Sequence, residues 1–177
     1  MKKKINNNFK FNKQNILKAK SIIAKYPKKF QISATIPLLH LVQVQLDGWI
    51  SKSSIEYISK FLKIPLIRVY EVAGFYHMFN LKKVGNNCIH VCTTTSCWLR
   101  GSNLILKEFE KNLKIKVGET TNDNLVTLKE IECLGACINA PVVKINNDFC
   151  ENLKLKDVKN LINKLTSRKK VLINKNA

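Results

Sequence analysis

The sequence predicts an α/β protein built in two parts, a small bundle of helices followed by a sheet that packs against helices. Two observations support this fold class. Up to about residue 80, apolar residues recur three and four residues apart, as they do along one face of a helix. After that point, short runs rich in β-branched residues alternate with helical stretches in the order strand, helix, strand, strand, helix. We therefore expect residues 1–80 to form a helical N-terminal domain with a basic arm and residues 81–177 to form an α/β domain.

Four short amphipathic helices are expected in the first part. The first lies near Lys13–Tyr26, and the second spans about Ser33–Leu46, with its first residue as the cap. Ser53 is expected to cap the third helix, where Glu56 completes a capping box. Pro65 then stands in the first turn of the fourth. The apolar positions of the last two helices are Ile55, Ile58, Leu62, Val69, Val72, Tyr76 and Phe79.

The second part contains three predicted strands and two predicted helices. The strands are Cys88–Cys92, Val126–Ile131 and Val142–Ile145, and the last of them runs into a hairpin turn at Asn146–Asp148. A helical stretch follows Thr93–Ser96, and another helix ends the domain. The apolar faces are expected to consist of Leu99, Leu106, Phe109 and Leu113 in the first helix, and of Val158, Leu161, Ile162 and Leu165 in the second.

The composition is that of an ordinary globular protein. The 177 residues suffice for a hydrophobic core, and 45% are hydrophobic and 24% charged. No stretch approaches the roughly 18 uninterrupted apolar residues of a membrane span. The basic start has no apolar run behind it and is neither Arg- nor Ser-rich, so it resembles neither a secretory signal nor a transit peptide. We expect a soluble protein that stays where it is made and does not insert into a membrane.

The net charge of +19 comes almost entirely from lysine. Residues 1–29 carry ten Lys and no acidic residue, whereas residues 86–150, which hold all six cysteines, carry seven basic and seven acidic residues. Direct readout of guanine favours the two-pronged guanidinium of Arg, and the chain has only three Arg. We therefore expect a solvated surface and no nucleic-acid partner. A coding bias explains the lysines, with weak attraction to an acidic partner or anionic lipid as the alternative.

Four of the six cysteines form two close pairs, Cys92 with Cys97 and Cys133 with Cys137, and both pairs follow predicted strands. Once one thiolate binds a metal, a close neighbour in the sequence closes a small ring at little further cost in entropy. Four thiolates suit either tetrahedral zinc or a [2Fe–2S] cluster, and the spacing alone leaves both open. Disulfides are disfavoured because no export signal is present, and the C-x-x-C pair of a thioredoxin-type redox site is absent.

The residues that flank the pairs favour the iron–sulfur alternative. Hydroxyl side chains fill Thr93–Ser96, and Gly135 and Ala136 lie between the second two cysteines, where small residues let the loop curl around a metal. These loops resemble those of the thioredoxin-like [2Fe–2S] ferredoxins that form the small iron–sulfur component, the E subunit, of NADH:quinone oxidoreductase, respiratory complex I. The resemblance covers about residues 26–165. The other matching segments are Leu38–Gln43, Gly48–Ser51, Ile64–Pro65, Arg68–Ala73, Phe75–Tyr76, Met78–Phe79, Gly118–Thr121 and Ala140–Pro141.

The resemblance implies a helical N-terminal domain followed by a thioredoxin-like [2Fe–2S] ferredoxin domain. It implies one [2Fe–2S] cluster, with Cys92 and Cys97 on one iron and Cys133 and Cys137 on the other. The cluster would take one electron from the FMN of the partner NADH-binding flavoprotein subunit, with the other peripheral-arm subunits of complex I as further partners. This arm lies on the cytoplasmic face of the inner membrane, or in the mitochondrial matrix. FMN and NADH would be bound by the partner, so this subunit of an oxidoreductase is expected to be inactive alone.

The remaining cysteines and the nearby histidine are expected to lie outside the cluster. Cys88 shares one face of its strand with His90 and Cys92, and we expect a reduced, partly buried thiol there. Cys150 stands where the family has Tyr, and a disulfide with Cys88 stays open. Four cysteines already complete the site without His90. For Trp98, which follows the ligand loop, shielding of the cluster, contact with the flavoprotein and core packing all stay open.

Two other functions stay open at this point. One is the equivalent diaphorase subunit of an NAD-linked hydrogenase or formate dehydrogenase, which would differ in its partners. The other, of a different class, is a zinc-stabilised interaction module, with a basic nucleic-acid binder as a variant. Gly74 and His77 depart from the hydroxylic Thr that is usual in the resembling family, but neither lies near the cysteines in the sequence.

Overall fold

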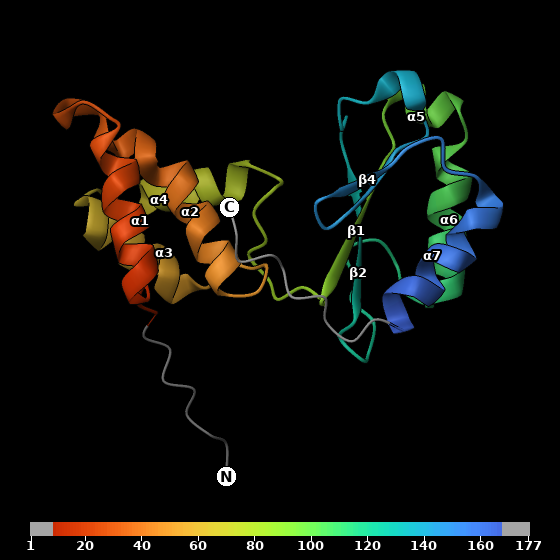
Figure 1. Ribbon diagram of the computed structural model, residues 1–177, viewed down its shortest axis with the longest axis horizontal. Coiled ribbons are helices and arrows are strands. Elements are labelled where there is room, and N and C mark those ends of the chain that lie inside the picture. The colour runs from red at the N-terminus through yellow and green to blue at the C-terminus, as the bar shows by residue number, and fades with distance from the viewer. Residues whose placement is uncertain (1–8, 168–177) are drawn as a thin grey trace, which may run out of the picture. The chain divides into compact units, whose positions relative to one another are not determined.

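The structure, a computed structural model, describes residues 9–167. The chain divides into two compact units between Lys83 and Val84 (Figure 1). The described part of the first, the helical unit (residues 9–83), consists of helices and turns, and the second, the sheet unit (residues 84–167), contains a four-stranded sheet with helices. The predicted α/β fold with an N-terminal helical bundle is therefore confirmed. No helix within residues 9–167 has the length and apolar content that a membrane crossing requires.

The helical unit is held together by one apolar cluster to which each of its α-helices contributes. Its elements are α1 (Lys13–Ala24), the 3-10 helix η1 (Lys28–Ala34), α2 (Thr35–Gln45), α3 (Lys52–Leu62) and α4 (Leu66–Phe75). Leu38, Leu39 and Val42 of α2 are fully buried and pack with Ile55 and Ile58 of α3. Burying one such side chain contributes about 1.5–3 kcal/mol, so the periodic apolar positions of the sequence are what forms this bundle.

The predicted helix over Ser33–Leu46 begins later than expected, and its cap was wrong. Ser33 lies inside η1, and α2 begins after Ala34, which makes no side-chain cap hydrogen bond. A serine accepts hydrogen bonds at a helix start only when its backbone is extended. Here the chain is already helical before Thr35, whose hydroxyl instead donates to the Ile32 carbonyl at 2.6 Å.

The cap of α3 also differs from the prediction. Ser51, with an extended backbone, is the N-cap, and its Oγ accepts from the Ser54 backbone N–H at 3.2 Å. Ser53 is the second residue of the helix, so Glu56 lies five residues after the N-cap, too far along the chain to complete a capping box. Pro65 directly precedes α4 rather than lying in its first turn, because its backbone is extended.

The sheet unit has the strand order β2-β1-β3-β4. Its strands are β1 (Asn87–Cys92), β2 (Val126–Ile131), β3 (Val143–Ile145) and β4 (Asp148–Cys150). β1 pairs with β2 in parallel and with β3 antiparallel, and β3 and β4 form a hairpin whose turn has Asn146 at positive φ. The helices are α5 (Thr95–Leu99), α6 (Ser102–Leu113), the short 3-10 helix η2 (Cys137–Asn139) and α7 (Leu155–Ser167).

One face of the sheet carries the core of this unit. Figure 1 shows α6 and α7 lying together on the same side of the sheet. Ile89 and Val91 of β1 and Leu128 of β2 are fully buried there against Phe109 of α6 and Val158 of α7. Since side chains alternate across a strand, the neighbours of Ile89 and Val91 on β1, namely the even-numbered residues, lie on the other face.

The helical stretch predicted after Thr93–Ser96 is two helices rather than one. Gly101, at φ +86°, separates α5 from α6, a backbone conformation that glycine adopts without strain. Leu99 therefore does not share the apolar face of Leu106 and Phe109 and is 71% exposed. Ile105, which the prediction left out, is buried in its place.

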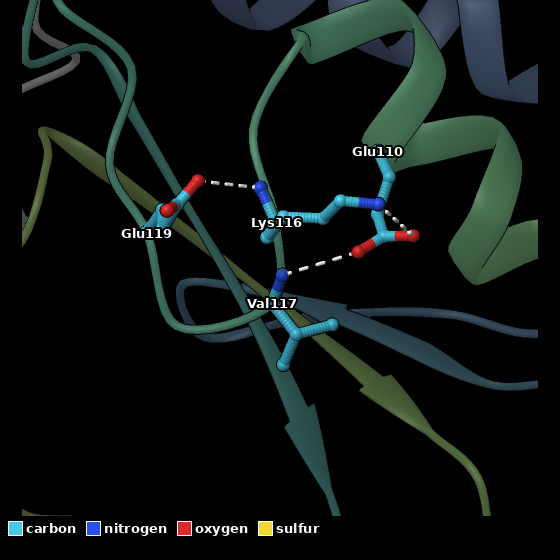
Figure 2. A network of polar contacts seen from close by, with 4 residues as sticks. All are labelled: Glu110, Lys116, Val117 and Glu119. Atoms are coloured by element: carbon cyan, nitrogen blue, oxygen red, sulfur yellow. Dashed lines mark hydrogen bonds and ion pairs between the residues drawn. The ribbon is translucent and has the colours of Figure 1, made fainter.

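The connection from α6 to β2 is tied to the helix by a carboxylate. Figure 2 shows Glu110 of α6 reaching the loop, where its Oε1 accepts from the Val117 backbone N–H at 3.3 Å and its Oε2 lies 3.9 Å from Lys116 Nζ. Glu119 accepts from the Lys116 backbone N–H at 2.7 Å. These contacts fix the loop that returns the chain to the sheet at β2.

Candidate metal centre

The topology brings the two predicted cysteine pairs to one end of the sheet. Cys92 is the last residue of β1, and Cys133 follows the end of β2. Because β1 and β2 are parallel, with Cys92 in register with Ile131, the ends of both strands lie at the same edge. Cys97 lies in α5, directly after β1, and Cys137 opens η2, so each pair is completed by the turn that follows its strand.

The four sulfurs are arranged as two pairs. Cys133 Sγ and Cys137 Sγ are 3.3 Å apart. Cys92 and Cys97 are joined by a side-chain hydrogen bond. The charge of Cys92 acts to raise the pKa of both Cys133 and Cys137, so the two pairs lie close to each other. No group of three or more His, Cys, Asp or Glu side chains surrounds a single metal position within residues 9–167.

The two pairs differ in exposure. Cys92 and Cys97 are each only 1% exposed and pack with Ala140 and Val142 in a small apolar cluster. Cys133 and Cys137 are both exposed. The site therefore has an inner side covered by protein and an outer side open at the surface, an asymmetry that the sequence did not predict.

In the buried pair, one thiol is set to ionise before the other. Burial acts to raise the pKa of Cys92, but hydrogen bonds from the side chain and backbone of Thr94, from Cys97 and from the Leu134 backbone outweigh it, and the pKa is lowered. Burial, followed by the hydrogen bond with Cys92, raises the pKa of Cys97 to about 11, against a hydrogen bond from the Val142 backbone. In the hydrogen bond between these two thiols, Cys97 is the donor, and Cys92 is the one with the lower pKa.

The exposed pair repeats this arrangement. A hydrogen bond from the Gly135 backbone N–H, followed by one with Cys137, lowers the pKa of Cys133. The Gly135 nitrogen lies 3.4 Å from Cys133 Sγ. The same Cys133–Cys137 contact, together with the charge of Cys133, raises the pKa of Cys137. In each pair, one thiol thus has a lowered pKa and the other a raised pKa, and all four would be thiolates once they held a metal.

Only some of the predicted hydroxyl donors face the sulfurs. Thr94 Oγ1 lies 3.2 Å from Cys92 Sγ, and a side-chain hydrogen bond from Ser96 lowers the pKa of Cys137 against the larger effect of Cys133. Thr93 instead donates to Glu130 Oε1 at 2.5 Å. Sequence reasoning missed the backbone donors of Leu134 and Val142 altogether, because every residue type carries a backbone N–H and the residue type thus gives no signal.

The other candidate residues of the sequence lie on the face of β1 opposite α6 and α7, or away from β1. Cys88 is buried, which raises the pKa of its thiol to about 11, and its Sγ lies 3.6 Å from His90 Nε2. Burial, followed by the charges of Lys129 and Lys144, lowers the pKa of His90 to about 4. Cys150 packs against the helix-covered face of the sheet. All six cysteines are free thiols, and Cys88 and Cys150 lie on opposite faces, so the disulfide left open by the sequence does not form.

A comparison with family models decides the affiliation of this chain. Residues 19–166 match the model described as thioredoxin-like [2Fe–2S] ferredoxin. The chain belongs to the thioredoxin-like [2Fe–2S] ferredoxin family. The resemblance that the cysteine loops indicated is therefore confirmed, and the match spans both units of the structure rather than the sheet unit alone.

Individual relatives agree with the family. The chain is 54% identical over 158 residues to the E subunit of the NADH-quinone oxidoreductase of Rickettsia conorii, covering 89% of this chain and 95% of the relative. It is 48% identical over 161 residues to the mitochondrial NADH dehydrogenase [ubiquinone] flavoprotein 2 of Dictyostelium discoideum, covering 91% of this chain and 65% of that relative. Among solved structures, the NAD+-reducing [NiFe]-hydrogenase in its H2-reduced state shares the fold, with a TM-score of 0.67 and 21% identity over 76% of this chain and 22% of the hydrogenase chain.

The donor set fits the cluster of this ferredoxin family. The chain supplies four thiols in two pairs, one pair at the end of each of β1 and β2. Two thiolates on each of two irons is the ligand demand of a [2Fe–2S] cluster. The backbone N–H groups of Gly135, Leu134 and Val142 and the hydroxyl of Thr94 supply the hydrogen bonds that ligand sulfurs accept.

Replacing Gly135 is expected to destabilise the protein, because its φ of +81° is strained for any residue with a Cβ. A Cβ at this position would meet nothing within 4 Å, so backbone strain is the whole effect. We expect Gly135→Ala to lower the free energy of unfolding by about 1–2 kcal/mol. The matched control is Gly74→Ala, in α4 and equally open, which should raise it by about 0.5–1 kcal/mol. Urea unfolding followed by circular dichroism measures both, and equal effects would contradict the strain argument.

Proposed function

We propose that the chain is the electron-transfer subunit of an NADH:quinone oxidoreductase and holds one [2Fe–2S] cluster through Cys92, Cys97, Cys133 and Cys137. The observation that carries the proposal is the meeting of two thiol pairs at the ends of β1 and β2, in a chain of the [2Fe–2S] ferredoxin family. When bound, the cluster supplies a carrier of one electron at a time. All-cysteine ligation favours a low reduction potential, of order −400 mV.

The buried and the exposed thiol pair are expected to hold different sides of the cluster. Cys92 and Cys97, which are buried, would hold one iron on the side that the protein covers. Cys133 and Cys137, which are exposed, would hold the other iron on the side open to the surface. Because protein covers the inner side, the surface beside Cys133 and Cys137 is the shortest route for an electron into and out of the site.

The electron comes from the FMN of an NADH-binding flavoprotein subunit. The sequence contains no glycine-rich loop for a nucleotide phosphate, so NADH and FMN chemistry belongs to a partner. The relatives named as the E subunit of NADH-quinone oxidoreductase support this assignment at about half identity and nearly full length. The chain then works in the peripheral arm of that complex, on the cytoplasmic or matrix side of the membrane, and is inactive alone.

Apolar side chains beside the ligands form the docking surface for this partner. Trp98 and Leu99 follow Cys97, Ile138 follows Cys137, and their side chains are 55%, 71% and 91% exposed. Large apolar side chains that gather at a surface mark an interaction site. A cavity of about 330 Å³ is lined by residues that include Leu104 and Pro141 and the cations Arg100 and Lys154, and Arg100 directly follows Leu99 in the chain. An apolar partner segment with a carboxylate suits this surface.

A second assembly shares the fold. The solved NAD+-reducing [NiFe]-hydrogenase contains a region of the same architecture, so the diaphorase part of a hydrogenase is the alternative. The two differ in what the subunit is purified with. Affinity purification under mild detergent recovers quinone-reducing membrane subunits in the first case and a hydrogenase subunit in the second.

The proposed function is tested by anaerobic reduction of the assembled chain and its flavoprotein partner. NADH is expected to produce the electron paramagnetic resonance signal of a reduced [2Fe–2S] cluster. Leu99→Gln and Ile138→Gln should each weaken partner binding about tenfold, since truncating an interface anchor removes about 1.4 kcal/mol or more. Val117→Gln is the control, because Val117 is partly exposed but lies on the α6–β2 loop.

Two outcomes would contradict the proposal. A colourless protein that contains zinc and gives no signal on reduction would replace the electron-transfer role with that of a structural zinc module. A normal signal that NADH cannot produce through the flavoprotein, although dithionite can, would retain the cluster but reject the partner. Equal binding by Leu99→Gln, Ile138→Gln and Val117→Gln would move the docking surface elsewhere.

A further inference from the structure

The Thr94 hydroxyl does not make the hydrogen bond that a threonine at the N-cap of a helix normally makes. It is the N-cap of α5, with an extended backbone at φ −74° and ψ 167°, yet its side chain makes no cap hydrogen bond. Threonine at such a position ordinarily accepts from a backbone N–H of the first turn. Here Thr94 Oγ1 instead lies 3.2 Å from Cys92 Sγ, in a half-buried position within the loop that joins Cys92 to Cys97.

The direction of this hydrogen bond follows from coordination chemistry. In the free protein either atom could donate. A thiolate bound to iron has lost its proton and can only accept, so with the cluster in place the Thr94 hydroxyl must donate to Cys92. The same hydroxyl also acts, more weakly, to lower the pKa of Cys133, which belongs to the other pair.

We infer that Thr94 raises the reduction potential of the cluster, an inference that rests on the proposed function because it requires the cluster to be bound. Reduction adds one electron, so the sulfurs carry more negative charge in the reduced state than in the oxidised state. A hydroxyl donor aimed at a ligand sulfur stabilises the more negative state by more. Because Cys92 is buried, little water competes with Thr94 for a hydrogen bond to its sulfur.

The neighbouring threonine provides a matched control. Thr93 belongs to the same four hydroxyl residues, but its hydroxyl donates to Glu130 Oε1 at 2.5 Å and does not reach a sulfur. Thr93→Val and Thr94→Val are therefore the same chemical change one residue apart, and only the second removes a donor to Cys92. Thr94→Ser keeps a hydroxyl on the same Cβ and should restore the wild-type behaviour.

The test is a redox titration of the full-length, cluster-loaded chain, followed by electron paramagnetic resonance with dithionite as the reductant. In Thr94→Val the equilibrium constant for one-electron reduction should fall about tenfold, equivalent to a potential about 59 mV lower. Thr94→Ser and Thr93→Val should stay close to wild type. An unchanged potential in Thr94→Val, or an equal decrease in Thr93→Val, would overturn the inference.

Measuring how much cluster each variant holds separates the possible failures of this experiment. Iron and sulfide contents are measured for each variant, and Thr94→Ala replaces Thr94→Val if the methyl group that valine places at the hydroxyl position prevents loading. If neither variant holds a cluster, Thr94 is required for assembly and the tuning role is wrong. If the wild-type chain itself shows no cluster signal, the proposed function fails instead, so the two failures are distinct.

Discussion

Changing Cys133 and Cys137 together to Ser is expected to abolish binding of the [2Fe–2S] cluster, whereas changing Cys88 and Cys150 together to Ser should leave it intact. The first pair supplies the outer thiolates, with sulfurs 3.3 Å apart. A serine hydroxyl ionises far less readily than a thiol and does not replace two soft ligands at once. The second pair lies on opposite faces of the sheet, away from the site, so its loss removes no ligand.

Iron and acid-labile sulfide per chain, together with the visible absorption of the cluster, measure this result. Circular dichroism shows whether each double variant keeps its helices and sheet. Because Cys133 and Cys137 are exposed, their replacement should preserve the fold of the free chain. A full iron content in the Cys133→Ser, Cys137→Ser variant would reject the ligand assignment, and iron loss on changing Cys88 and Cys150 would add a ligand from outside the two pairs.

Phe109→Ala is expected to lower the free energy of unfolding of the sheet unit by about 3–5 kcal/mol. Phe109 is fully buried between α6 and the sheet, and it is the largest of the fully buried side chains. Its removal leaves a cavity under the strand that ends at Cys92. A domain is stable by only about 5–15 kcal/mol, so this single change removes a large share of the total. Leu104→Ala, on the same helix but 57% exposed, should cost about 0.5 kcal/mol or less.

The fluorescence of the two tryptophans shows in which unit the free energy of unfolding is lowered. Trp98 lies in the sheet unit and Trp49 in the helical unit. In a Trp49→Phe background, the urea transition followed by Trp98 fluorescence should move to lower urea for Phe109→Ala and stay in place for Leu104→Ala. In a Trp98→Phe background, the transition followed by Trp49 should change much less. A shift of both signals by the same amount would show that the two units unfold as one.

Local patterns predicted the elements well but their ends poorly. The strand Val126–Ile131 and the turn at Asn146 were predicted as observed, because alternation and turn residues act over a few positions. The caps at Ser33 and Ser53 were wrong. Several serines lie near each helix start, and which of them caps it depends on where the backbone leaves the helical conformation, which packing against the neighbouring helix decides.

At the cysteine site too, the sequence predicted some features and missed others. Their close spacing within each loop was enough to predict the four candidate ligands. It was not enough to predict which pair is buried, or that Cys88 and Cys150 lie on opposite faces of the sheet. Among the four hydroxyls between Cys92 and Cys97, the sequence treated all alike, and only the fold directs Thr94 to a sulfur while Thr93 turns to Glu130.

The sequence by itself therefore determined the fold class, most of the helices and strands, and the membership of the two thiol pairs, because each depends on residues close together along the chain. Tertiary structure alone decided how the pairs meet, which one faces solvent and which hydroxyl contacts Cys92. The physical reason is the parallel pairing of β1 with β2. It joins segments far apart along the chain at one edge of a sheet, and no local spacing encodes that contact.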